Sequence, residues 1–233
     1  MKASLFGYCA THKKTERHKM ENFNRKKHWE TIYQTKRFED VSWFQPTPET
    51  SLSFFKQLNI QTSAKIIDIG GGDSFLVDNL LDLNYQDLTV LDISATALDK
   101  AKQRLGERAD KVKWIVADVA TFRPTEKYDF WHDRAAFHFL TQELEIENYL
   151  NTVQKSIQPT GIFVIGTFSE QGPEKCSGIE IKQYSETTMT DRLAKFFEKI
   201  KCIKVDHKTP SDAIQNFIFC SFKKLHKKNV SHI

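Results

Sequence analysis

The chain has 233 residues, a formal net charge of +4 and a hydrophobic content of 39%. This length suits one α/β domain with additional segments rather than two domains, and the composition supports a sizeable core. No apolar run is long enough to span a membrane and nothing near Met1 resembles a signal peptide, so no membrane association is expected. The lysines gather towards both ends, a distribution more typical of solvated tails than of a nucleic-acid-binding face.

The four cysteines, Cys9, Cys176, Cys202 and Cys220, are scattered and form no C-x-x-C pair. This spacing predicts neither a disulfide framework nor a structural zinc site. A reducing, cytoplasmic location is therefore the expectation.

Residues 1–19 are polar and basic and show no apolar periodicity, which predicts an extension without fixed structure. Met20 offers a second plausible start. We expect a single domain over residues 20–224, with lid helices in its first part (20–60) and a mobile tail over 225–233.

Two aromatic-rich segments precede the first predicted strand. The first is a helix over 25–36 that places Trp29 and Tyr33 on one face, and the second is a loop that contains Trp43 and Phe44. Such a segment either packs against the sheet as an ordinary terminal helix or covers a ligand site as a lid.

Residues 64–75 read AKIIDIGGGDSF, which predicts a buried strand, a glycine turn and the start of a helix. The glycines let a ligand approach the backbone, and the helix presents free N–H groups. Asp68 ends the strand, where its carboxylate repels a pyrophosphate and attracts a cation. Phe75 stands where the dinucleotide-binding pattern requires glycine, which disfavours a nicotinamide oxidoreductase. The pattern therefore favours a nucleoside ligand that carries an amino group.

The next two predicted strands also end near acids. The strand over 88–92 ends in Asp92, 24 residues after Asp68, and the strand over 112–116 is followed by Asp118. An acid at the position of Asp92 is placed to accept hydrogen bonds from both hydroxyls of a ribose.

A fourth predicted strand, 128–132, continues into Asp133 and Arg134, and His138 follows. Asp133 or His138 is a candidate general base, and Arg134 a candidate partner for an anionic substrate. Alternatively, Asp133 and Arg134 form a structural ion pair and His138 packs in the core. Nothing in this pattern requires a metal ion, and none is predicted.

A polar loop over 169–178 follows the fifth predicted strand, 162–168, at the strand end where α/β sheets keep their sites. Cys176 and Ser177 of this loop are candidates for shaping the substrate pocket. A helix and two strands are then predicted, at 188–197, 203–205 and 217–222.

These features occur together as the motifs HWE, SWF, DIGGG, LDIS, HDRAAFHFL and GPEKCSG between His28 and Phe222. The set resembles the class I S-adenosylmethionine-dependent methyltransferases, in a bacterial-type subgroup similar to thiopurine methyltransferases. The leader and loop are also similar to eukaryotic protein-lysine methyltransferases. The resemblance implies a Rossmann-like three-layer α/β sandwich. Its seven-stranded, mostly parallel sheet would have the order 3-2-1-4-5-7-6, with the last strand antiparallel and an N-terminal helical lid.

The resemblance also implies the cofactor, S-adenosyl-L-methionine, with S-adenosyl-L-homocysteine as product. Asp92 would hold the ribose, Asp118 the adenine amino group, and Tyr33 with Lys36 the cofactor's carboxylate. The implied cofactor-binding residues are Tyr33, Trp43, Phe44, Asp68, Gly70, Gly71, Gly72, Asp92, Ile93, Asp118, Val119 and His132.

The sequence indicates the methyl acceptor less clearly than it indicates the cofactor. The chain lacks the Asn/Asp-Pro-Pro-Tyr/Phe and Pro-Cys sequences of enzymes that methylate nucleobases, so a nucleic-acid partner is not expected. We expect in-line transfer of a methyl group to a heteroatom of a small molecule, by a monomer or weak dimer. A protein-lysine methyltransferase and a non-catalytic cofactor-binding module remain the alternatives.

Overall fold

The computed structural model describes residues 23–225, so the expectations for residues 1–19 and for nearly all of the tail lie outside the described residues. Its central sheet has the order β3-β2-β1-β4-β5-β9-β8. The strands are β1 (Lys65–Ile69), β2 (Asp87–Asp92), β3 (Val112–Val116), β4 (Tyr128–Arg134), β5 (Ile157–Phe168), β8 (Phe197–Lys208) and β9 (Ile214–Lys224). β9 runs antiparallel to both of its neighbours, whereas the strands from β3 to β5 pair in parallel. The predicted fold class and strand order are confirmed.

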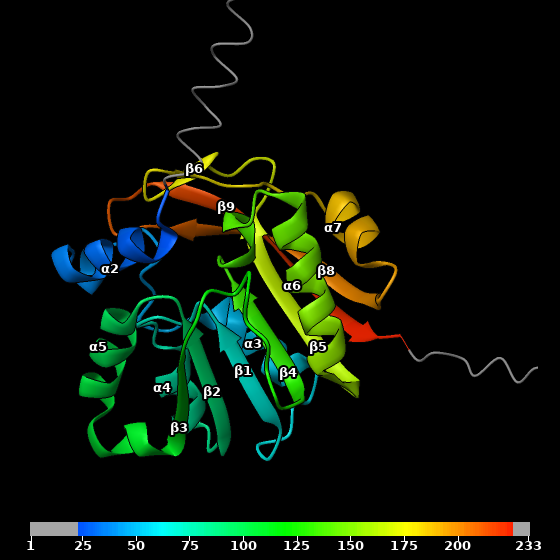
Figure 1. Ribbon diagram of the computed structural model, residues 1–233, viewed down its shortest axis with the longest axis horizontal. Helices are drawn as coiled ribbons and strands as arrows, with labels where there is room; N and C mark the ends of the chain where they lie inside the picture. Colours follow the sequence, from blue (N-terminus) through cyan, green and yellow to red (C-terminus); the bar gives the residue numbers. More distant parts are fainter. Residues whose placement is uncertain (1–22, 226–233) are drawn as a thin grey trace, which may run out of the picture.

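Helices cover both faces of this sheet (Figure 1). They are α2 (Arg25–Thr35), α3 (Glu49–Gln57), α4 (Leu76–Asp82), α5 (Ala95–Leu105), α6 (Glu143–Ser156) and α7 (Glu186–Leu193), with 3-10 turns η1 (Phe38–Asp40), η2 (Gly106–Lys111) and η3 (Phe137–Phe139). α3, α4 and α5 share one apolar cluster with the sheet, through residues such as Phe55 and Leu80. α6 and α7 pack into a second cluster on the opposite face, through Tyr149 and Leu193.

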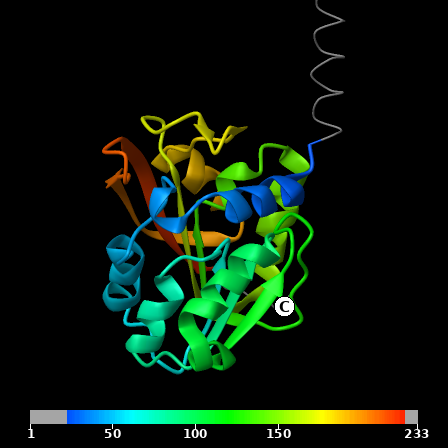
Figure 2. The ribbon, with the colours of Figure 1, turned by 90° about the vertical axis from the view of Figure 1, so that its left-hand side faces the viewer.

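The central strands are continuous apolar runs because helices bury both of their faces. Ile66 and Ile67 of β1 and Phe130 and Trp131 of β4 are fully buried or nearly so. Strands β1 to β4 end at the same edge of the sheet, and α2 lies across this edge above α5 (Figures 1 and 2). The fold therefore brings the glycine turn, the strand-end acids and the N-terminal segment together.

The C-terminal elements differ from the sequence prediction in extent. β8 and β9 are much longer than the predicted segments 203–205 and 217–222, because they pair with each other along nearly their whole length. Lysine and acid side chains along β8 hide its strand pattern at the sheet edge. α7 begins at Glu186, two residues early, because Ser185 and Thr188 form a capping box.

A disulfide joins Cys202 of β8 to Cys220 of β9. The prediction that no disulfide forms is therefore wrong for this pair. The two residues face each other across adjacent antiparallel strands, a pairing that depends on strand register and leaves no short spacing motif. Cys176 is a free, buried thiol.

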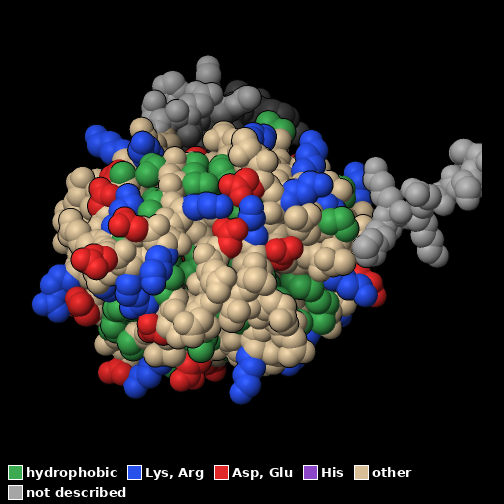
Figure 3. Space-filling model, turned by 90° about the horizontal axis from the view of Figure 1, so that it is seen from below, with side chains coloured by type: hydrophobic (Ala, Val, Ile, Leu, Met, Phe, Trp, Pro, Cys, Tyr) green, Lys and Arg blue, Asp and Glu red, His purple; other side chains and the backbone are tan. Residues whose placement is uncertain are grey.

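Figure 3 shows the molecule from below the view of Figure 1, and basic and acidic side chains are interspersed on this face. No helix in residues 23–225 is both long enough and apolar enough to cross a membrane.

Candidate functional site

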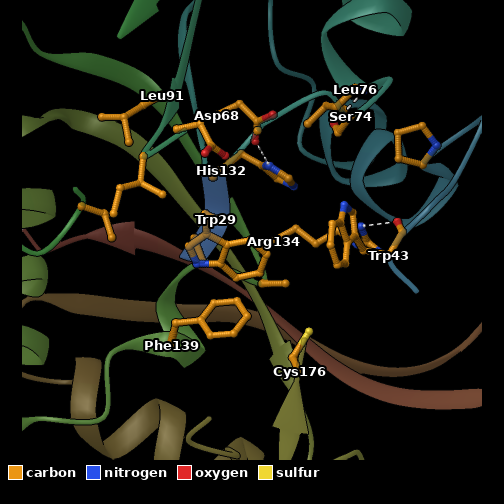
Figure 4. Close-up of a pocket in the computed structure, with 18 of the residues that line it drawn as sticks. Trp29, Trp43, Asp68, Ser74, Leu76, Leu91, His132, Arg134, Phe139 and Cys176 are labelled. Carbon is orange, nitrogen blue, oxygen red and sulfur yellow. Dashed lines mark hydrogen bonds and ion pairs between the residues drawn. The ribbon is translucent and has the colours of Figure 1, made fainter. Parts of the chain in front are cut away.

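A pocket of about 1160 Å³, including its opening to solvent, lies at the carboxyl edge of the sheet. Its lining comes from α2, the loop after it, the glycine turn, the ends of β2, β3 and β4, and residues of β5, β6 (Lys175–Cys176) and β9. Figure 4 shows ten of these residues labelled around one space, among them Asp68, Arg134 and Trp43. Chain segments far apart in the sequence thus share one concave site.

The glycine turn leaves no room for side chains. Gly70 and Gly72 have positive φ angles of +65° and +50°, a conformation that favours glycine. A Cβ atom on Gly72 would lie 2.5 Å from the hydroxyl of Tyr33, and one on Gly71 would lie 2.7 Å from the carboxylate of Asp68. The turn therefore brings bare backbone between the lid and the strand-end acids.

Asp92 is buried at the end of β2, with only 5% of its surface exposed. One of its carboxylate oxygens accepts a hydrogen bond from the backbone N–H of Ser94 at 2.8 Å. Burial raises the pKa of Asp92 to about 7, and the nearby charges of Asp73 and Asp68 add to this rise. A buried acid with spare acceptor capacity at a pocket wall is suited to hold hydroxyl groups.

Asp68 and His132 form a buried pair on neighbouring strands. Asp68 Oδ1 lies 2.7 Å from His132 Nδ1, and His132 Nε2 lies 3.0 Å from Ser51 Oγ of α3. Parallel pairing of β1 with β4 sets these two side chains side by side. Asp68, His132 and Ser51 are thus linked by hydrogen bonds, and all three line the pocket.

An aromatic cluster covers the pocket from above. The ring of Trp29 on α2 meets Phe139 with centroids 5.0 Å apart and Trp43 at 5.8 Å. Tyr33, one helical turn further, packs against Trp43. All four residues line the pocket. The N-terminal segment therefore forms a cover over the site.

Polar contacts attach α2 of this cover to the ends of the neighbouring elements. Glu30 accepts hydrogen bonds from the backbone N–H groups of Ala95 and Thr96 and from the hydroxyl of Ser94, at the start of α5. Arg25 binds both carboxylate oxygens of Asp118 at 3.1 Å.

The three predicted catalytic residues do not share the pocket. Asp133 and Arg134 are consecutive residues of β4 and point to opposite faces of the sheet, and His138 lies on η3. Asp133 is fully buried, accepts a hydrogen bond from the Tyr149 hydroxyl at 2.6 Å, and is absent from the pocket lining. His138 is also buried outside the lining, and burial lowers its pKa to about 3. Catalytic roles for these two residues stay predictions. Arg134 alone of the three lines the pocket.

The structure brings most of the predicted cofactor residues to this pocket. Those in its lining are Tyr33, Trp43, Asp68, Gly70, Gly71, Asp92, Ile93, Asp118, Val119 and His132, and Cys176 joins them. Gly72 lies behind Gly71 against Tyr33, whereas Phe44 packs on Phe38 and Phe75 and is not in the lining. Ser177 is also outside the lining.

Several further pocket residues were not predicted from the sequence as parts of the site. They are Arg25, Trp29, Phe38, Gln45, Ser51, Phe75, Phe139, Phe168, Gln215 and Phe217. Trp29 carried a signal, since it shares a helix face with Tyr33. Gln215 and Phe217 on β9 carried none, because only the folded sheet brings the last strand beside β5.

Comparison with known sequences supports a methyltransferase domain. Residues 66–161 match the family model described as a methyltransferase domain. The chain is 28% identical over 86 residues to malonyl-[acyl-carrier protein] O-methyltransferase 1 of Ilyobacter polytropus, covering 36% of this chain and 32% of that protein. It is 27% identical over 99 residues to a mouse eEF1A lysine and N-terminal methyltransferase, covering 42% of this chain and 14% of that protein. The matches thus span a third or less of these two relatives.

Solved structures share the fold over most of the chain. One is a structure from a study of the conversion of a disulfide bond into a thioacetal group during echinomycin biosynthesis. It has a TM-score of 0.72 at 16% sequence identity, and the match covers 88% of this chain and 94% of that chain. The N-methyltransferase NodS from Bradyrhizobium japonicum, in complex with S-adenosyl-L-homocysteine, has a TM-score of 0.60 at 16% identity, covering 84% and 99%. At 16% sequence identity, the structural similarity shows the fold alone, which is the Rossmann-like fold of these methyltransferases.

Proposed function

We propose that this chain is an S-adenosylmethionine-dependent methyltransferase that moves a methyl group to a heteroatom of a small-molecule acceptor. The observation that carries the proposal is that a bare glycine turn and the buried acid Asp92 line one aromatic-covered pocket. The family match over this segment and the fold likeness support it.

The pocket residues fit this cofactor. Gly70 and Gly71 line the pocket with backbone that carries no side chain, which suits the close approach of the methionine end. Asp92 has acceptor capacity for the ribose hydroxyls, and the acids Asp68 and Asp92 oppose a cationic ligand. Asp118 would meet the adenine amino group with Oδ2, which accepts from Arg25 alone, because Oδ1 already accepts from both Arg25 and the backbone N–H of Ala120.

When bound, S-adenosylmethionine supplies a methyl group on a positively charged sulfur, and the protein's contribution is alignment and exclusion of water. Trp29, Tyr33 and Trp43 exclude water from above, and their π faces suit a sulfonium. Asp133 and His138 lie beneath the pocket wall. We propose that they position the β4 end, because Asp133 accepts from the backbone N–H groups of Ala136 and Phe137.

A small acceptor is favoured by the enclosure of the site. The aromatic cover and Arg134 leave a space lined mainly by apolar side chains. The matched I. polytropus protein is named for malonyl-[acyl-carrier protein], whereas the mouse protein is named for a lysine acceptor. A protein-lysine acceptor is therefore the second candidate.

The test combines binding and transfer. Calorimetry is expected to show 1:1 binding of S-adenosylhomocysteine, and labelled S-adenosylmethionine incubated with metabolite extracts is expected to yield labelled small products. Label on protein alone would favour the lysine methyltransferase, and binding without transfer would favour a non-catalytic module. Preferential binding of NAD would contradict the cofactor assignment.

A further inference from the structure

Within residues 23–225, no carboxylate forms a salt bridge with the guanidinium of Arg134. Its Nη1 donates a hydrogen bond to the backbone oxygen of Trp43 at 3.2 Å. Its Nη2 is buried and has no hydrogen-bond partner among the described residues. Asp68, the acid whose charge acts on Arg134, instead pairs with His132 at 2.7 Å. A buried donor on a charged group without a partner is a position where a ligand anion is favoured.

The groups around Arg134 do not neutralise the positive charge of its guanidinium. Burial lowers the pKa of Arg134 to about 10, so the guanidinium remains protonated at neutral pH. Burial raises the pKa of the Cys176 thiol to about 11, which keeps this neighbour uncharged. The ring of Phe217 lies 5.4 Å from the guanidinium carbon and adds attraction without neutralising it.

The position of Arg134 separates it from the nucleoside end of the pocket. Asp92 ends β2 and Asp118 follows β3, on one side of the glycine turn, whereas Arg134 ends β4, on the side of β5 and β9. Figure 4 shows Arg134 on the side of the pocket where Phe139 and Cys176 lie, away from Leu91. Phe168 and Phe217 complete apolar walls on this side.

We propose that Arg134 Nη2 binds a carboxylate of the methyl acceptor, so that the substrate class is small carboxylic acids with an apolar body held between Phe139, Phe168 and Phe217. This inference rests on the function proposed above, which places the cofactor at the opposite end of the same pocket. The arginine also repels an ammonium group, which disfavours lysine as acceptor. The cofactor's own carboxylate is the other possible source of the anion, and the experiment separates the two.

The first experiment compares benzoate with its uncharged isostere benzamide on protein saturated with S-adenosylhomocysteine. Calorimetry on the wild type is expected to show about tenfold tighter binding of benzoate, the effect of one charged hydrogen bond. Arg134→Gln is expected to abolish the preference and Arg134→Lys to retain part of it. Arg108→Gln, which removes an exposed arginine paired with Asp82, is the matched control and keeps the preference. Equal affinities in the wild type, or a preference that survives in Arg134→Gln, would overturn the proposal.

The second experiment identifies whose carboxylate Arg134 binds. Affinities for S-adenosylhomocysteine and for 5′-methylthioadenosine, which lacks the amino-acid end, are measured in wild type and Arg134→Gln. We expect both affinities to be unchanged, which also shows that the variant is folded. A loss of about tenfold for S-adenosylhomocysteine alone would assign the site to the cofactor and overturn the acceptor proposal. No binding of S-adenosylhomocysteine to the wild type would instead contradict the function proposed above.

Discussion

Asp92 is the residue whose protonation most directly affects the proposed cofactor site. Its pKa is raised to about 7 by burial, so the free protein holds a proton there at pH 6 and has largely lost it at pH 8. Because hydrogen bonds from ribose hydroxyls favour the ionised carboxylate, binding at low pH must expel this proton. We expect the affinity for S-adenosylhomocysteine to be about tenfold lower at pH 6 than at pH 8. Calorimetry across this range measures it.

Asp92→Asn provides the control for this pH dependence. The amide keeps the size of the side chain but does not titrate, so its weaker affinity should be nearly independent of pH. A wild-type affinity that is flat from pH 6 to pH 8 would show that Asp92 is not the group that the ligand contacts.

Gly72 offers a second prediction for a single residue, with a matched control elsewhere in the chain. Gly72 and Gly106 both have positive φ angles, of +50° and +58°, so alanine strains the backbone at either site. A Cβ atom at Gly106 meets nothing within 4 Å, whereas at Gly72 it lies 2.5 Å from the Tyr33 hydroxyl. We expect Gly72→Ala alone to lose S-adenosylhomocysteine affinity, by about tenfold or more, because Tyr33 must move. Equal affinities in the two variants would contradict a tight turn under the lid.

The role of a single residue could be predicted from the sequence where its position at the end of a predicted strand places it at the site. Asp68, Gly70 and Asp92 come directly at strand ends, and the parallel sheet gathers those ends at one edge. Side-chain partners far apart in sequence could not be predicted. Arg25 meets Asp118 across 93 positions, and Arg134 reaches the backbone of Trp43 across 91.

At the scale of elements, α2 depends on Glu30 for its attachment to α5. Glu30 accepts three hydrogen bonds from Ser94, Ala95 and Thr96, and these outweigh burial and lower its pKa, so the carboxylate is ionised at the N-terminus of α5. Glu30→Ala is expected to lower the free energy of unfolding by about 1 kcal/mol through loss of this cap. It should also speed dissociation of S-adenosylhomocysteine, since α2 carries Trp29 and Tyr33.

Stopped-flow tryptophan fluorescence measures that dissociation, because Trp29 and Trp43 line the pocket. Glu39→Ala is the control. Glu39 is an exposed acid in the same N-terminal segment, and its salt bridge with Arg37 lies on the surface. Equal dissociation rates for Glu30→Ala and the wild type would show that α2 does not act as a lid held by this contact.

Helix and strand boundaries could be predicted from the sequence where a capping residue and the apolar periodicity indicate the same boundary. Ser94 directly precedes the apolar period of α5 and caps this helix, since its side chain accepts a hydrogen bond from the N–H of Ala97. β8 was predicted as three residues because its alternating pattern is interrupted by lysines. Its length comes from pairing with β9, which is a tertiary effect that no local pattern records.

For the whole molecule, the sheet order was predicted from the resemblance to the class I methyltransferases, and the observed order agrees with it. The alternation of strands and helices is consistent with this order, because parallel strands with helical crossovers have few allowed arrangements. The register of the final antiparallel pair was not predictable in the same way. That register sets Cys202 opposite Cys220, and the disulfide was missed for this reason.

The disulfide leads to a prediction about the stability of the whole domain. It links residues 18 positions apart and so restricts the unfolded chain, which corresponds to about 3 kcal/mol of stability in the chain-entropy description. Urea denaturation followed by circular dichroism is expected to show a lower midpoint when dithiothreitol is added to the oxidised protein. The double variant Cys202→Ala/Cys220→Ala should not respond to the reductant, whereas Cys176→Ala should respond as the wild type does, because Cys176 is a free thiol. Identical midpoints for the wild type with and without reductant would show that the β8–β9 pair holds together without this bond.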